Sequence, residues 1–82
     1  MTDDQLLDRI TSDPAVMVGK PVIKGSRLSV EFILNLLAHG ETVESILAEY
    51  PRLRPQDIQA CLLFASRSLE STSFLPLPVE AP

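Results

Sequence analysis

The residues of this sequence that can do chemistry are mainly cations, and the first group lies in one short stretch. Residues 19–27 hold Lys20, Lys24 and Arg27 between turn-forming residues. No Asp or Glu occurs from residue 14 to residue 30, although the whole chain has a net charge of −4. A locally basic stretch in an acidic chain indicates contact with an anion. Nucleic-acid phosphate and the carboxylates of a protein partner both fit. In a third arrangement, Arg27 pairs with a carboxylate of its own fold and the lysines are solvated.

A second stretch combines two arginines with two glutamines. Arg52 and Arg54 precede an expected helix, and Gln56 and Gln59 lie in its first turns. Arginine suits phosphate, and a glutamine side chain can make two hydrogen bonds to adenine, so these four residues are candidate DNA contacts. Asp57 would oppose phosphate unless it contacts a cytosine amine or stabilises the helix dipole. Polar residues at a helix start often face only solvent, so spacing alone leaves DNA contact open.

The other reactive side chains predict neither catalysis nor a cofactor. His39 has no second His or suitably spaced Cys for a zinc site, and it suits a helix C-terminus. Cys61 falls on an apolar stripe, where it acts as a small hydrophobe. The sequence has no Cys–His pair with an orienting group and no Gly-rich phosphate loop. We expect no enzyme, no metal, no cofactor and no small-molecule substrate.

Size and composition indicate one small domain. A chain of 82 residues with a single cysteine has no internal disulfide, and such domains often gain burial by pairing. We therefore expect a homodimer. No run of about 18 apolar residues exists, so no membrane contact is expected. The N-terminus, Met1-Thr2-Asp3-Asp4, is acidic where a signal peptide is basic, and the unpaired cysteine suits the cytoplasm.

Three helices must position the second basic stretch. The apolar period predicts a helix from its cap at Ser29 to Gly40, and a shorter one from its cap at Thr42 to Pro51. The third covers Pro55–Leu69 and has a weak cap, because an arginine precedes it. A helix, a turn, a short helix, a four-residue joint and a longer helix follow the order of a trihelical helix-turn-helix domain. The predicted fold class is mainly α.

The segments on either side complete the predicted organisation. Residues 1–28 form an N-terminal β arm that serves in dimerisation, and residues 29–70 form the helical domain. Within the arm, Ala15–Val18 and Val22–Ile23 are the β-prone pair, while Asp4–Ile10 fits a short helix or a strand. A lone two-stranded ribbon is marginal in water, so it packs on the helices or on a second copy.

The last segment, residues 71–82, is predicted to be an extended, Pro-rich tail. Three prolines in twelve residues exclude a helix and favour polyproline II backbone. A frayed end is one interpretation. The tail is too apolar for a solvated linker, however, and such a strip can lie in the groove of a partner. The candidate partner-binding residues are Phe74, Leu75, Leu77 and Val79.

Two of the predicted helices carry a second apolar strip. In the first helix it consists of Phe32 and Leu36, and in the third of Ala60, Leu63 and Phe64. A helix that is apolar nearly all round is buried on both sides. In so small a protein, the sequence favours another chain as cover for the second side.

The segment from about Ile10 to Ala65 resembles a prokaryotic family, domain of unknown function 433 (DUF433), whose members are regarded as VapB-like antitoxins. The pattern of that family is matched, in order, by Ile10, Asp13-Pro14, the run Gly19-Lys20-Pro21-Val22-Ile23-Lys24-Gly25-Ser26-Arg27-Leu28-Ser29-Val30, Gly40, Tyr50-Pro51-Arg52-Leu53 and Asp57-Ile58. About two thirds of the chain is covered. Arg54 stands where many members have Ser or Thr, and the tail lies outside the shared pattern.

The resemblance implies a homeodomain-like helix-turn-helix domain with extra N-terminal strands, and a dimer. It also implies an antitoxin that silences a PIN-like nuclease toxin and represses the shared operon. PIN-like nucleases hold their metal with acidic residues, so Lys20, Lys24 and Arg27 could plug that site. Two alternatives remain open: a protein-only toxin neutraliser, and a stand-alone dimeric DNA-binding regulator without a toxin.

Overall fold

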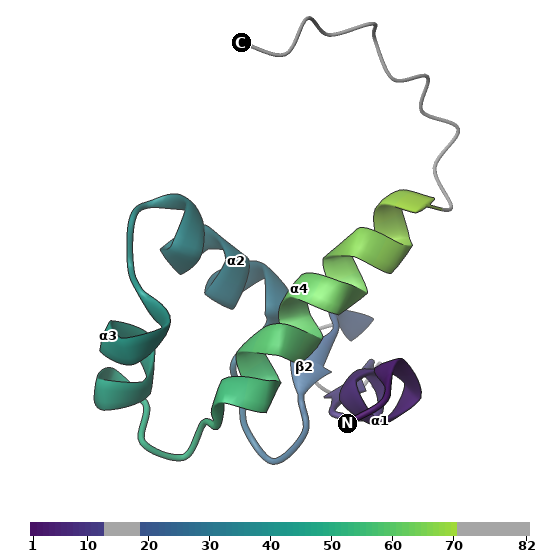
Figure 1. The fold of residues 1–82 in the computed structure, drawn as a ribbon, viewed down its shortest axis with the longest axis horizontal. Helices are drawn as coiled ribbons and strands as arrows, with labels where there is room; N and C mark the ends of the chain where they lie inside the picture. The colour runs from purple at the N-terminus through teal and green to yellow at the C-terminus, as the bar shows by residue number, and fades with distance from the viewer. Residues whose placement is uncertain (13–18, 71–82) are drawn as a thin grey trace, which may run out of the picture.

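The structure, a computed structural model, describes residues 1–12 and 19–70 and is mainly helical. Its elements are α1 (Asp3–Leu7), β1 (Ile10–Thr11), β2 (Val22–Ile23), α2 (Val30–Ala38), α3 (Val43–Glu49) and α4 (Pro55–Glu70). Figure 1 shows α4 through the middle of the molecule, with α2 and α3 on one side of it and α1 on the other. The predicted trihelical arrangement is confirmed, and a fourth, short helix is added at the N-terminus. No helix in the described residues is long and apolar enough to cross a membrane.

The ends of α2 and α3 are fixed by the residues that the sequence indicated. The Ser29 hydroxyl accepts the Phe32 N–H at 3.0 Å and so caps α2. Thr42 caps α3 in a reciprocal capping box. At the C-terminal end of α2, His39 Nδ1 lies 2.7 Å from the carbonyl oxygen of Asn35. The predicted role of His39 at a helix terminus is confirmed.

The N-terminal segment forms both a helix and a strand. A capping box at Thr2 starts α1, and the chain then becomes extended and pairs with β2 in antiparallel register, Ile10 opposite Ile23. The β-prone pattern predicts Ala15–Val18 as the partner of β2. That segment lies outside the described residues, and the strand that pairs with β2 is Ile10–Thr11. The two-stranded sheet packs on α4, which covers it within the same chain.

The core is built from branched aliphatic residues of β2 and the last three helices, because aromatic residues are scarce. Its fully or nearly buried members are Ile23, Val30, Ile33, Ile46, Leu53, Ile58 and Cys61. The rings of Phe32 and Tyr50 meet edge to face, with centroids 6.0 Å apart, and join α2 to the end of α3.

The second apolar strips are covered mostly within their own chain. Ala60 is completely buried, and Leu36 and Phe64 pack against the core. Phe32 is 37% exposed and Leu63 is partly buried, so the expected contact of these strips with another chain stays a prediction. What remains open on α4 is Leu62, which is 49% exposed, and Leu69, which is 69% exposed.

Candidate nucleic-acid interface

Two loops that are far apart in the sequence lie side by side below the start of α4 in Figure 1. One is the loop between β2 and α2, and the other is the turn between α3 and α4. Together they line a hollow of about 330 Å³ whose walls include Arg27 from the first loop and Arg52 from the second. The sequence had assigned these arginines to two separate stretches. The fold brings them to one surface.

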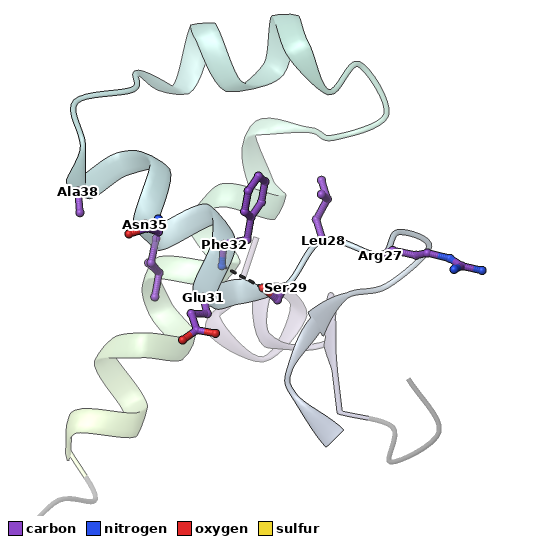
Figure 2. A pocket seen from close by; sticks show the side chains of 8 residues that line it. Arg27, Leu28, Ser29, Glu31, Phe32, Asn35 and Ala38 are labelled. Carbon is purple, nitrogen blue, oxygen red and sulfur yellow. Dashed lines mark hydrogen bonds between the residues drawn. The ribbon is translucent and has the colours of Figure 1, made fainter. Parts of the chain in front are cut away.

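The loop that carries Arg27 is held by its own backbone and by Ser26. Gly25 has a φ of +78°, which favours glycine, and it turns the chain after β2. The Ser26 hydroxyl donates to the Ile23 carbonyl at 2.9 Å and accepts the Leu28 N–H at 3.1 Å. Figure 2 shows the Arg27 side chain pointing away from α2. Internal hydrogen bonds thus hold the loop, and the Arg27 guanidinium points away from α2.

The turn that carries Arg52 is anchored by a buried leucine. The Leu53 N–H donates to the Tyr50 carbonyl at 2.9 Å, and the Leu53 side chain is nearly buried in the core. Arg52 and Arg54 stand on either side of Leu53, and both are exposed. Burial of the central residue fixes the turn, so the flanking arginines point outward from a defined position.

Asp57 contributes a hydrogen bond at the N-terminal end of α4, where the cap residue is an arginine. Its carboxylate oxygen Oδ2 accepts the Arg54 N–H at 2.9 Å, which is the half of a capping box that the third helical residue supplies. The other oxygen, Oδ1, accepts from Arg9 Nη1 at 3.0 Å. Asp57 is buried. Its burial and its two hydrogen bonds disfavour the alternative in which Asp57 contacts a cytosine amine. Its position also agrees with a role at the helix dipole.

The two glutamines occupy one side of the first turns of α4. Gln59 is exposed, and Gln56 is half-buried. They are three positions apart, so their side chains project in similar directions from the helix. Of the two, Gln59 is the one whose amide is fully available to a ligand.

Of the seven lysines and arginines in the chain, four have a carboxylate partner among the described residues. Lys20 Nζ lies 3.0 Å from Glu31, Lys24 Nζ lies 3.3 Å from Asp8, and Arg9 and Arg67 are paired as well. One expectation was that Arg27 pairs with a carboxylate and that the lysines are solvated. The described residues show the opposite, because both lysines are paired and Arg27 has no ion pair there. Exposed pairs such as those of the lysines contribute little, at most about 1 kcal/mol.

The three cations without an ion pair in the described part of the chain are Arg27, Arg52 and Arg54. We call them the arginine cluster. Glu49 also lines the hollow between the two loops, but it pairs with none of the three within residues 1–12 and 19–70. Within residues 1–12 and 19–70, the cations that no carboxylate engages thus lie in the loop after β2 and in the turn before α4, and Arg27 and Arg52 line one hollow.

The remaining reactive groups do not form a second site. Cys61 is buried, and burial together with the nearby Asp57 carboxylate raises the pKa of its thiol to about 12. Such a thiol is a packing residue. Within residues 1–12 and 19–70, no three side chains of His, Cys, Asp or Glu gather in a way that could hold a metal ion.

The Arg9–Asp57 pair and the candidate tail residues were the parts of the candidate site with the least local signal. The Arg9–Asp57 pair went unnoticed, although an acidic residue at the third position of a helix with a weak cap is a recognisable half of a capping box. The candidate tail residues Phe74, Leu75, Leu77 and Val79 lie outside the described residues.

Comparison with known proteins agrees with this architecture. The uncharacterized protein y4eO of Sinorhizobium fredii (strain NBRC 101917 / NGR234) is 32% identical over 56 residues, which are 68% of this chain and only 25% of that protein. A crystal structure of a DUF433 member protein from Anabaena variabilis ATCC 29413 superposes with a TM-score of 0.73 at 25% identity, over 82% of this chain and 66% of that one. The sequence model of the family described as protein of unknown function (DUF433) matches residues 10–65, so the chain belongs to the DUF433 family.

Proposed function

We propose that this protein is an antitoxin-like regulator that binds DNA through the arginine cluster and the first turns of α4. One observation carries the proposal: of the three cations without a carboxylate partner among the described residues, Arg52 and Arg54 flank Leu53 just before α4, and Arg27 lines the same hollow as Arg52. Arginine side chains of this kind bind phosphate oxygens and set the position of a protein on the duplex.

In the proposed mode of binding, α3 crosses the DNA backbone and α4 enters the major groove. Gln59 reads a base edge, and Gln56 contributes from its half-buried position. Arg52 and Arg54 contact phosphates on one side of the helix start. Arg27 extends the contact from the loop after β2, which no simple three-helix domain would supply.

The buried pair of Arg9 and Asp57 supports this assignment. An exposed carboxylate in the first turn of α4 would repel the phosphate backbone. Here the Asp57 side chain is only 10% exposed and is bound to Arg9, so it is withdrawn from the outer surface. The start of α4 therefore presents positive charge to a ligand without a competing acid in its first turn.

A protein partner is the second part of the proposal. The family resemblance suggests a PIN-like nuclease toxin, and the exposed Leu62 and Leu69 give α4 an apolar surface away from the arginine cluster. An apolar surface on an otherwise acidic protein favours protein contact, either with the toxin or with the second subunit of a homodimer. A protein-only neutraliser would use this surface and leave the arginine cluster without a ligand.

An electrophoretic mobility shift with a fragment containing the promoter region of its own gene tests DNA binding. Wild-type protein is expected to retard the fragment at low salt, with affinity that falls steeply as salt rises. The double variant Arg52→Ala, Arg54→Ala is expected to lose most of that affinity. Arg67→Ala is the matched control, because it removes an exposed arginine that is paired with Asp3 near the other end of α4.

Absence of retardation at low salt would decide against DNA binding. An equal loss of affinity in the double variant and in Arg67→Ala would decide against the arginine cluster as the contact. In the proposal, a PIN-like nuclease is the protein partner, and neutralisation of such a nuclease, measured by its RNA-cleaving activity, is expected to survive the double variant. Retained neutralisation without any DNA binding would establish the protein-only neutraliser.

A further inference from the structure

A mainly apolar groove lies between α2 and the C-terminal half of α4, away from the arginine cluster. It has a volume of about 390 Å³ and is lined by Pro21, Val30, Glu31, Leu34, Phe64, Ala65, Ser68 and Leu69. Its acidic residue, Glu31, is paired with Lys20 at 3.0 Å. Glu31 and Leu34 also line a larger hollow of about 810 Å³ along the outer side of α2, shown in Figure 2. The groove is therefore open at one side and continues along α2.

The groove ends where the described chain ends. Leu69 forms part of its wall and is 69% exposed, and Glu70 is the last residue of α4. Twelve further residues follow, numbers 71–82. No other segment of the described chain covers this wall. The segment that continues from it is the first candidate for an occupant.

Chain length permits this segment to fold back into the groove. Four steps from Glu70 bring Phe74 up to about 14 Å away, since an extended chain advances at most about 3.6 Å per residue. The wall from Leu69 back to Phe64 is about 7.5 Å long, because a helix rises about 1.5 Å per residue. Ser71, Thr72 and Ser73 are small and suit a reversal. Phe74 can thus reach any point along this wall.

The composition of the segment matches the groove in character. Residues 74–79 read Phe-Leu-Pro-Leu-Pro-Val and carry no charge. Proline fixes φ near that of polyproline II, so such a strip loses little backbone entropy when it binds. Pro-rich strips of this kind dock in grooves with aromatic walls, and here Phe64 supplies an aromatic side chain.

We propose that residues 74–79 dock in this groove of their own molecule. The three-residue linker gives the segment a local concentration on the order of millimolar, so a weak contact is enough to keep the groove occupied. Docking would cover the exposed face of Leu69 and complete the apolar contact around Leu34. A protein partner that binds either the tail or the groove would then have to displace this contact first.

Two-dimensional amide NMR of the full chain tests the proposal. The variant Phe74→Ser, Leu77→Ser is expected to shift the amide signals of Leu34, Ala65 and Leu69 relative to wild type. The signals of Ile46 and Leu53, on the other side of the core, are expected to stay unchanged. Glu80→Gln is the matched control in the same tail and is expected to leave all five signals in place. The tail variants alter no residue of the described fold, so the core remains folded.

Dilution separates this proposal from its rivals. The chemical shifts of the Leu34, Ala65 and Leu69 amides are expected to be independent of protein concentration over a hundredfold range, because the contact is within one molecule. Loss of the contact on dilution would place the tail of a second copy in the groove and overturn the proposal. Unchanged signals in Phe74→Ser, Leu77→Ser would overturn it as well. The experiment contains no DNA and no toxin, so its result is independent of the proposed function.

Discussion

Arg9 Nη1 lies 3.0 Å from Asp57 Oδ1, and this contact joins two residues that are 48 positions apart in the chain. The Asp57 side chain is 10% exposed, and that of Arg9 is 28% exposed. Since the second Asp57 oxygen caps α4 at the Arg54 N–H, one carboxylate ties the N-terminal segment to the start of the helix that carries the candidate DNA contacts. The pair is therefore a positioning element for the arginine cluster as well as a tertiary contact.

Removal of the arginine from this pair is expected to be costly. Arg9→Met leaves the buried Asp57 carboxylate without its cation, and we expect a loss of about 3 kcal/mol in the free energy of unfolding. Adding Asp57→Asn to Arg9→Met is expected to recover part of that loss, because the amide oxygen can still accept the Arg54 N–H. Urea denaturation measures both. Arg67→Met, which breaks an exposed pair, is the control and is expected to cost less than about 1 kcal/mol.

The raised pKa of Cys61 predicts that the folded protein loses stability at alkaline pH. Its pKa is raised from 9.0 to about 12 in the folded protein, first by burial and then by the Asp57 charge. Between those values the unfolded chain loses its thiol proton and the folded chain keeps it. Stability contributed by the neutral thiol is therefore complete below pH 9 and falls as pH rises above it, by about 1.4 kcal/mol per unit at most. The measurement is the difference between wild type and Cys61→Ala in urea midpoints at each pH. A difference that stays constant from pH 8 to pH 11 would contradict the prediction.

The local features of the fold could be predicted from the sequence because neighbouring residues determine them. Ser29 and Thr42 cap helices within three residues of themselves, and His39 contacts a carbonyl four residues earlier. Hydrogen bonds of this range depend on residue type and spacing, and the sequence displays both. The bounds of the last three helices followed from such signals and from the apolar period.

The long-range features could not be predicted, since no local pattern encodes them. Strand β1 has two residues, too few for a period-two pattern, and its pairing with β2 depends on where α1 ends. The meeting of Arg27 with Arg52 at one hollow depends on how the loop after β2 packs beside the α3–α4 turn. The sequence therefore supplied the members of the candidate site but not their grouping.

The cap of α2 gives a prediction of stability that is independent of function. Ser29 is buried, and its hydroxyl accepts the Phe32 N–H. Ser29→Ala is expected to lower the free energy of unfolding by about 1 kcal/mol. Ser66→Ala is the matched control. That serine lies within α4, away from its ends, and is exposed to solvent, and alanine favours a helix. The changes in the free energy of unfolding caused by Ser29→Ala and by Ser66→Ala, measured by thermal or urea unfolding, should differ in sign or by at least about 1 kcal/mol. Equal stabilities would show that the cap contributes nothing.

Arg27 tests whether the loop after β2 and the start of α4 form one DNA-binding surface. If Arg27 contacts a phosphate, Arg27→Ala is expected to weaken binding to all DNA sequences by a similar factor. It should also reduce the slope of log affinity against log salt by about 0.9, the value for one released counterion. Lys20→Ala is the matched control, because it removes a cation of the same stretch that is engaged by Glu31. Fluorescence anisotropy with a labelled duplex at several salt concentrations gives both quantities. Equal effects of the two substitutions would mean that binding depends only on the net charge of residues 19–27. An unchanged slope in Arg27→Ala would limit the interface to Arg52, Arg54 and the glutamines of α4.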